Sequence, residues 1–99
     1  MNKYGLHGAL IAKEGKADNL AKILLKAAEM MSTAKGCHLY LISRDTEDNN
    51  LIWVTEAWDS KEDHDQSLQN DGVGEFISTA MPLLDGNPQK GQILQIFGG

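Results

Sequence analysis

The segment WVTEAWDSKEDHDQSL, residues 53–68, holds the side chains best suited to acid–base chemistry. His64 could accept a proton, because an unperturbed histidine titrates near neutral pH. Glu56 shares a strand face with Val54 and Trp58, and it needs a hydrogen-bond partner if that face borders a cavity. A structural reading is also open, in which His64 pairs with a neighbouring carboxylate and Glu56 is solvated at the strand end.

The acidic residues after Trp58 have the pattern of a helix start. Ser60 precedes Asp63 by three positions, so its hydroxyl can accept a hydrogen bond from a backbone amide that has no partner within the helix. The helix dipole also favours negative charge at this end. Four acidic residues lie there: Asp59, Glu62, Asp63 and Asp65. The segment therefore predicts a strand over 51–58 that leads into a helix ending at about Gln69.

Three residues of this helix share one face, because His64, Ser67 and Leu68 are three and four positions apart. Leu68 is expected to point at the sheet. His64 and Ser67 would then be drawn toward the cavity between this helix and the sheet.

No metal site is predicted. His7, His38 and His64 belong to three different elements, and neither an HxxxH nor an HxH spacing occurs. The acids of residues 45–56 imitate a calcium loop, but Asn50 stands where that loop needs glycine, and the flanks have the pattern of strands. The phosphate-binding patterns GxGxxG and GxxxxGK[ST] are also missing.

The periodicity of apolar residues predicts the element order β-α-β-β-α-β. Strands are expected over 4–12, 37–43, 51–58 and 92–97. Helices are expected over 16–35, where Gly36 ends the first, and over 59–69 and 75–84, where Pro82 kinks or ends the last. The connecting segments are 44–50, 70–74 and 85–91. This order predicts an α+β, ferredoxin-like fold, with a four-stranded antiparallel sheet and the helices on one face.

The composition restricts the classes of partner. A chain of 99 residues predicts one domain, residues 1–99, and a chain this short buries only about 60–65% of its unfolded surface, which favours self-association. The net charge of −5 argues against nucleic acid, whose phosphates need a basic face. Cys37 is the only cysteine, which favours a reducing compartment. No apolar run approaches the roughly 18 residues of a membrane helix, so we expect a cytoplasmic protein that does not bind membranes.

Apolar residues occupy both faces of the expected strands. In the second strand Leu39 and Leu41 alternate with Tyr40 and Ile42, and the third and fourth strands show the same pattern. A sheet that is apolar on both faces must be covered on both, and the chain has no further element for the second face. We therefore expect a homodimer in which two sheets pack face to face.

Three short motifs point to a known family. They are EAW (56–58), the helix start DSKE (59–62) and MPLL (81–84) after a broken second helix. Within a β-α-β-β-α-β chain this pattern resembles the antibiotic biosynthesis monooxygenase superfamily of dimeric α/β barrels. The resemblance extends from Tyr4 to Phe97 and is greatest to small bacterial quinol monooxygenases.

The resemblance implies a reaction without metal or flavin. Several members of the superfamily oxidise aromatic hydroquinones to quinones with molecular oxygen, in a pocket between the sheet and the helices. A base removes a phenolic proton, and the electron-rich phenolate can then react with oxygen in a dry cavity. The resemblance thus implies a cofactor-independent monooxygenase whose ligand is a small aromatic hydroquinone or polyphenol.

The chain departs from its relatives at one position of this motif. Many relatives carry a histidine nine positions after the tryptophan of ExW, and Ser67 stands there in this chain. His64 lies one turn earlier on the same helix face, so the hypothesis is that His64 takes over the role of the base. Haem-degrading relatives use three other residues, whose places hold Gly8, Ser67 and Ile77 here. Haem degradation is therefore not expected.

Three function classes follow from these observations. In the leading hypothesis the protein is an enzyme, with His64 as general base. The expected pocket residues are Ser67, Trp58, Trp53, Tyr40, Glu56 and Phe76, although the two tryptophans differ in parity, so that one belongs to the dimer face. The alternative is a non-catalytic ligand-binding or stress-response barrel of the same fold. An RNA-binding sheet is not expected, because the strands lack its aromatic signature and the chain is acidic.

Overall fold

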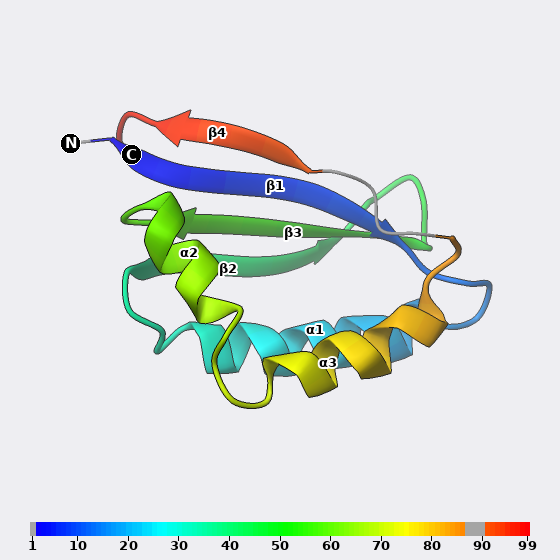
Figure 1. Cartoon of the computed structure of the whole chain (residues 1–99). Helices are drawn as coiled ribbons and strands as arrows, with labels where there is room; N and C mark the ends of the chain where they lie inside the picture. The colour runs from blue at the N-terminus through cyan, green and yellow to red at the C-terminus, as the bar shows by residue number, and fades with distance from the viewer. Residues whose placement is uncertain (1, 87–90) are drawn as a thin grey trace.

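The computed structural model describes residues 2–86 and 91–99. Its elements are β1 (Lys3–Ile11), α1 (Ala17–Met31), β2 (Cys37–Arg44), β3 (Leu51–Trp58), α2 (Lys61–Ser67), α3 (Val73–Ala80), the 3₁₀ turn η1 (Met81–Leu83) and β4 (Gln92–Ile96). The strands form one antiparallel sheet in the order β2-β3-β1-β4, and Figure 1 shows the helices on one side of it. The predicted ferredoxin-like α+β fold is confirmed. Of the predicted loop 85–91, residues 87–90 lie outside the described part.

The first helix is shorter than expected, because it ends at Met31 instead of residue 35. The hydroxyls of Ser32 and Thr33 donate hydrogen bonds to the carbonyl oxygens of the preceding turn, which competes with continuation of the helix. Gly36 follows in the left-handed region, at φ 80°. A side chain at Gly36 would collide with the Asp63 carboxylate, so glycine also allows α2 to approach closely.

The second helical region is divided in two, as predicted, with different boundaries. Ser60 caps α2, and its hydroxyl accepts a hydrogen bond of 3.1 Å from the backbone amide of Asp63. This confirms the predicted helix start. α2 ends at Ser67, and α3 already begins at Val73, because Gly72 adopts φ 89° and lets the chain reverse early.

The register of the sheet decides which side chains face the helices. Ile52 and Trp58 of β3 are fully buried, and they pack against helical residues such as Leu20, Leu24 and Met31. Side chains alternate along a strand, so every even-numbered residue of β3 faces the helices. Cross-strand partners on β1, which include Gly8 opposite Val54, share that face.

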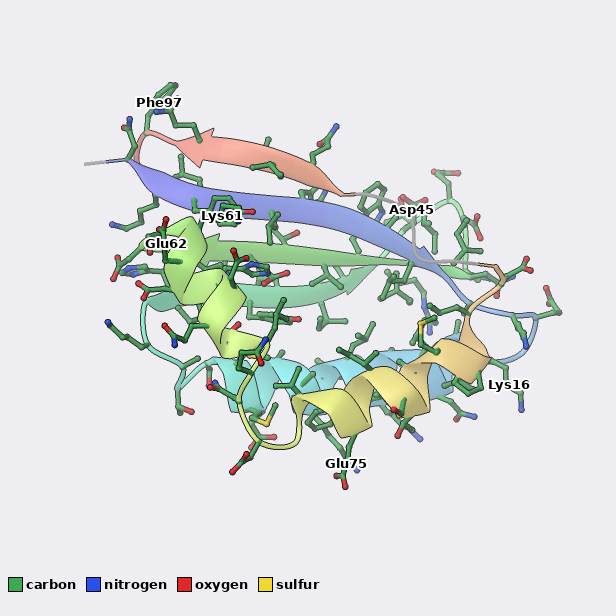
Figure 2. All side chains as sticks on the ribbon, in the orientation of Figure 1. Lys16, Asp45, Lys61, Glu62, Glu75 and Phe97 are labelled. Atoms are coloured by element: carbon green, nitrogen blue, oxygen red, sulfur yellow. The ribbon has the colours of Figure 1, made fainter. Side chains whose placement is uncertain are left out.

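The opposite face of the sheet carries no helix among the described residues (Figure 1). Leu39, Leu41 and Leu94 lie on it, and between 38% and 52% of each is exposed. Phe97, after the end of β4, is 80% exposed and projects from the sheet edge (Figure 2). That a second copy of the protein covers this face, as in the expected homodimer, stays a prediction. Within the described residues, no helix is both long and apolar enough to traverse a bilayer.

Candidate functional site

Glu56 is the buried carboxylate of the site. It lies on the helix-facing side of β3, between Tyr40 of β2 and Leu6 of β1, and its side chain is only 13% exposed. The indole N–H of Trp58 donates a hydrogen bond of 3.0 Å to Glu56 Oε1, which provides the partner that burial requires. Burial raises the pKa of this carboxyl, and the Trp58 bond and the nearby His64 offset part of that rise.

His64 lies on α2 between two carboxylates. Its Nε2 is 3.8 Å from Glu56 Oε1, and its Nδ1 is 3.0 Å from Asp65 Oδ1. The imidazole is 16% exposed and is held by the rings of Tyr4 and Trp58, each 5.7 Å away between centroids. An imidazole in this position can stabilise a charge on Glu56 or relay a proton toward the surface.

The hollow that Glu56 faces lies over the centre of the sheet. It has a volume of about 280 Å³ and is bordered by Gly8 and Gly91, whose backbones come so close that a Cβ on Gly8 would lie 3.2 Å from the Gly91 Cα. Apolar side chains of the sheet and of α1, among them Leu10 and Leu24, form most of its wall. Glu56 is the only carboxylate on that wall within the described residues. The arrangement therefore suits a small, mostly apolar ligand that presents one hydrogen-bond donor to Glu56.

Tyr40 supplies a hydroxyl on the same wall as the Glu56 carboxylate. Burial is the main reason that the pKa of the Tyr40 phenol lies far above its usual value, and the negative charge of Glu56 adds to the rise. Tyr40 therefore stays a neutral phenol throughout the physiological range. It can donate a hydrogen bond to a ligand oxygen in the hollow.

A second, apolar cavity of about 190 Å³ holds the predicted pocket residue Phe76. It lies between α1 and α3, which run side by side beneath the sheet (Figure 1). Leu10, Leu24 and Tyr40 line both this cavity and the hollow over Gly8, so the two spaces are neighbours.

The two tryptophans have separate places, as their parity predicted. Trp58 is fully buried beside Glu56 and holds it without lining the hollow. Trp53 faces the other side of the sheet, where its ring stacks on His7 at 4.7 Å and its N–H donates to Asp45. Trp53 is therefore not part of the helix-side pocket, because Ile52 and Val54 take the inward positions of β3.

Ser67 and Leu68 are placed differently from the expectation. Ser67 is buried, and its hydroxyl donates a hydrogen bond of 2.6 Å to the His64 carbonyl instead of facing the hollow. Leu68 is 47% exposed at the edge of the apolar cavity and does not pack under α2 against the sheet. Leu68 is the C-cap residue of α2, and its backbone N–H still donates to the carbonyl oxygens of Asp65 and Gln66.

Two residues of the site were not singled out from the sequence. Gly8 matches only the place of a haem-degrading residue, although a glycine inside a strand is also a signal of close backbone approach, here by Gly91. Asp65 was assigned only to the helix start, and it also binds the His64 ring. Its other oxygen accepts from Lys61 at 2.6 Å, which fixes the carboxylate that orients the imidazole.

Comparisons with known proteins agree with this fold. Residues 4–79 match the model of the family described as antibiotic biosynthesis monooxygenase. A comparison with curated protein sequences gives no match. A conserved protein from Methanosarcina mazei Go1 has 18% identity and a TM-score of 0.88, with 97% of this chain and 94% of that one covered, which shows the fold alone.

Two structures with higher sequence identity carry the name "putative antibiotic biosynthesis monooxygenase". The protein from Chloroflexus aurantiacus J-10-fl is 35% identical, with a TM-score of 0.87 over 98% of this chain and 95% of that one. The protein from Deinococcus radiodurans is 28% identical, with a TM-score of 0.77 over 97% and 92%. The chain therefore belongs to the antibiotic biosynthesis monooxygenase family.

Proposed function

We propose that this protein is a monooxygenase that oxidises a small aromatic hydroquinone with molecular oxygen in the hollow over Gly8. The observation that carries the proposal is Glu56, a buried carboxylate of raised pKa at the wall of a mostly apolar space. Groups of this kind are characteristic of acid–base sites. Membership of the monooxygenase family supports the reaction type.

The proposed reaction begins with removal of one phenolic proton by Glu56. A raised pKa brings this carboxylate closer to the working pH and makes it a stronger base than an ordinary glutamate. The phenolate then supplies the electrons: one oxygen atom of O2 enters the ring and the other leaves as water, so that a hydroquinone becomes a hydroxyquinone. All four electrons come from the substrate, and no other reductant is required.

Glu56 and His64 have different roles in this proposal. Glu56 lines the hollow and His64 does not, which supports Glu56 as the first proton acceptor. His64 lies on the side of Glu56 away from the hollow and would stabilise the charge of Glu56 or pass on its proton. Its Nε2 lies 3.8 Å from Glu56 Oε1, and its Nδ1 is oriented by Asp65. Tyr40 would hold the second oxygen of the ring through its neutral hydroxyl.

The direct test is oxygen uptake by the purified protein with a panel of hydroquinones, in the presence of catalase and a metal chelator. We expect uptake that is proportional to protein concentration, with one hydroxyquinone formed for each O2 consumed. Saturable binding of these compounds without oxygen uptake would replace the proposal by the second candidate function. No binding and no uptake for any hydroquinone would contradict both.

The second candidate is a ligand-binding protein that keeps the fold without the reaction. The observation that favours it is Ser67, which stands where many relatives have a histidine. Its hydroxyl donates a hydrogen bond to the His64 carbonyl and does not face the hollow. The apolar walls would still bind an aromatic ring. The oxygen-uptake experiment separates the two candidates.

We also propose that the protein works as a homodimer, with the exposed sheet face as its interface. Leu41 lies on that face and is 52% exposed, whereas Leu25, 55% exposed, lies on α1. Sedimentation of the wild type should therefore show a dimer. Leu41→Lys should weaken the dimer by at least about 100-fold, because a two-fold axis buries the new charge twice.

Leu25→Lys is the matched control, since it adds the same charge to an equally exposed leucine and should leave the dimer intact. A wild type that sediments as a folded monomer at micromolar concentration would contradict the proposed assembly.

A further inference from the structure

The apolar cavity between α1 and α3 has almost no polar wall. Of the fourteen residues that line it, Tyr40 is the only one with a polar side chain group other than a thioether. Met30, Met31 and Met81 contribute flexible side chains, which adapt to apolar ligands of different shape. A space of about 190 Å³ with such walls exceeds the roughly 150 Å³ that is enough for benzene.

The mouth of this cavity is also apolar. Leu68, Ile77 and Met81 line it, and they are 47%, 53% and 42% exposed. Large apolar side chains around one opening are unfavourable in water and mark a binding groove. Glu75 of the same helix α3 points away from the sheet, so the polar face of α3 is separate from this opening (Figure 2).

The cavity adjoins the hollow that Glu56 lines. Leu10, Leu24 and Tyr40 form a shared boundary, with the carboxylate on one side and the apolar groove on the other. A ligand with its hydroxylated ring at Glu56 would therefore have an apolar cavity beside it, in the space between two helices. A ring without a substituent would leave that cavity empty.

We infer that the natural ligand is an amphipathic phenol, whose hydroxylated ring lies at Glu56 and whose apolar substituent chain lies between α1 and α3. This inference deepens the proposed function and rests on it for the position of the ring. It identifies the ligand class as alkyl- or prenyl-substituted hydroquinones, in contrast to unsubstituted ones. The substituent chain of the ligand is the occupant because the groove borders the ring site inside one protomer.

The test is a binding series under argon, where no turnover occurs. Calorimetric titration with 2-alkylhydroquinones from methyl to octyl should show that the Kd falls about fourfold for each methylene group, until the groove is filled and the Kd levels off. A Kd that is independent of chain length would overturn the inference. Oxygen uptake is measured separately with the same compounds, so a failure of the reaction and a failure of the chain site are distinguishable.

A substitution in the cavity tests where the alkyl chain of the ligand binds. Ala80 lines the cavity on α3, and Ala80→Phe should reduce the affinity ratio between hexyl- and methylhydroquinone to less than about threefold. Ser78→Phe adds the same ring to an exposed position of the same helix and should keep the wild-type ratio. An unchanged ratio in Ala80→Phe would place the chain elsewhere and overturn the inference.

A second variant covers the case that Ala80→Phe does not fold. Phe76→Ala enlarges the same cavity, so the affinity should level off at a longer chain than in the wild type. The same plateau in both proteins would equally overturn the inference.

Discussion

Glutamine in place of Glu56 is expected to lower the rate of hydroquinone-dependent oxygen uptake by at least about 100-fold, the smaller end of what general-base catalysis contributes. The amide is nearly the size of the carboxylate, and its oxygen can still accept the hydrogen bond of Trp58. It cannot take the phenolic proton. The loss should appear in kcat, measured with an oxygen electrode at saturating hydroquinone.

Glu62→Gln is the matched control for this variant. Glu62 is exposed in the first turn of α2 (Figure 2), so the substitution changes the net charge equally without reaching the hollow. Its rate should equal that of the wild type. Full activity in Glu56→Gln would remove Glu56 from the reaction and leave His64 as the candidate base.

Glu56→Gln should also be more stable than the wild type at pH 8. Burial raises the pKa of Glu56, so the folded protein binds this proton more tightly than the unfolded chain, and wild-type stability falls as pH rises through the folded pKa. Glutamine has no charge to bury, and the expected gain is about 0.5–2 kcal/mol, the range that a single stabilising substitution commonly gives. The gain should disappear as the pH falls well below the ordinary glutamate value of 4.5, where the carboxyl is protonated in both states.

Trp58→Ala is expected to lower the free energy of unfolding by about 3–5 kcal/mol, the usual cost of removing a large buried aromatic side chain. Trp58 is fully buried and packs with Met31 of α1 and Val73 of α3. The substitution also deprives Glu56 of its hydrogen-bond donor. Chemical denaturation at pH 7 measures the loss, which should be a large part of the 5–15 kcal/mol typical of a folded domain.

Trp58→Phe separates the two contributions of this side chain. Phenylalanine retains much of the apolar volume and lacks the N–H, so its cost should be less than half that of alanine. The pKa of Glu56 should rise further, because the Trp58 bond holds it down. A loss below about 1 kcal/mol for Trp58→Ala would contradict its place in the core.

The parts of the fold that depend on local pattern could be predicted from the sequence. Alternation along residues 51–58 predicted a strand with Trp53 and Trp58 on opposite faces, and the register confirms it. The Ser60 cap followed from its spacing to Asp63, because that bond closes within one helical turn. These features need no knowledge of distant residues.

The placement of the site depends on tertiary contacts that local pattern does not contain. The sequence could not decide which tryptophan faces inward, since that requires the packing of Ile52 under α1. It brought His64 and Glu56 into one segment, but only the crossing of α2 over β3 places the carboxylate on the hollow and the imidazole behind it. The Ser67 hydroxyl likewise donates to the His64 carbonyl instead of facing the hollow, which the shared helix face does not reveal.

The dependence of kcat/KM on pH, measured for the wild type and Glu56→Gln with one hydroquinone, tests most directly whether Glu56 takes the substrate proton. The wild-type rate should rise with pH along a limb whose midpoint lies above the ordinary glutamate value of 4.5, because burial raises this pKa. The limb should be missing from the residual rate of Glu56→Gln. The same limb in both proteins would contradict the assignment, since the titrating base would then be another group.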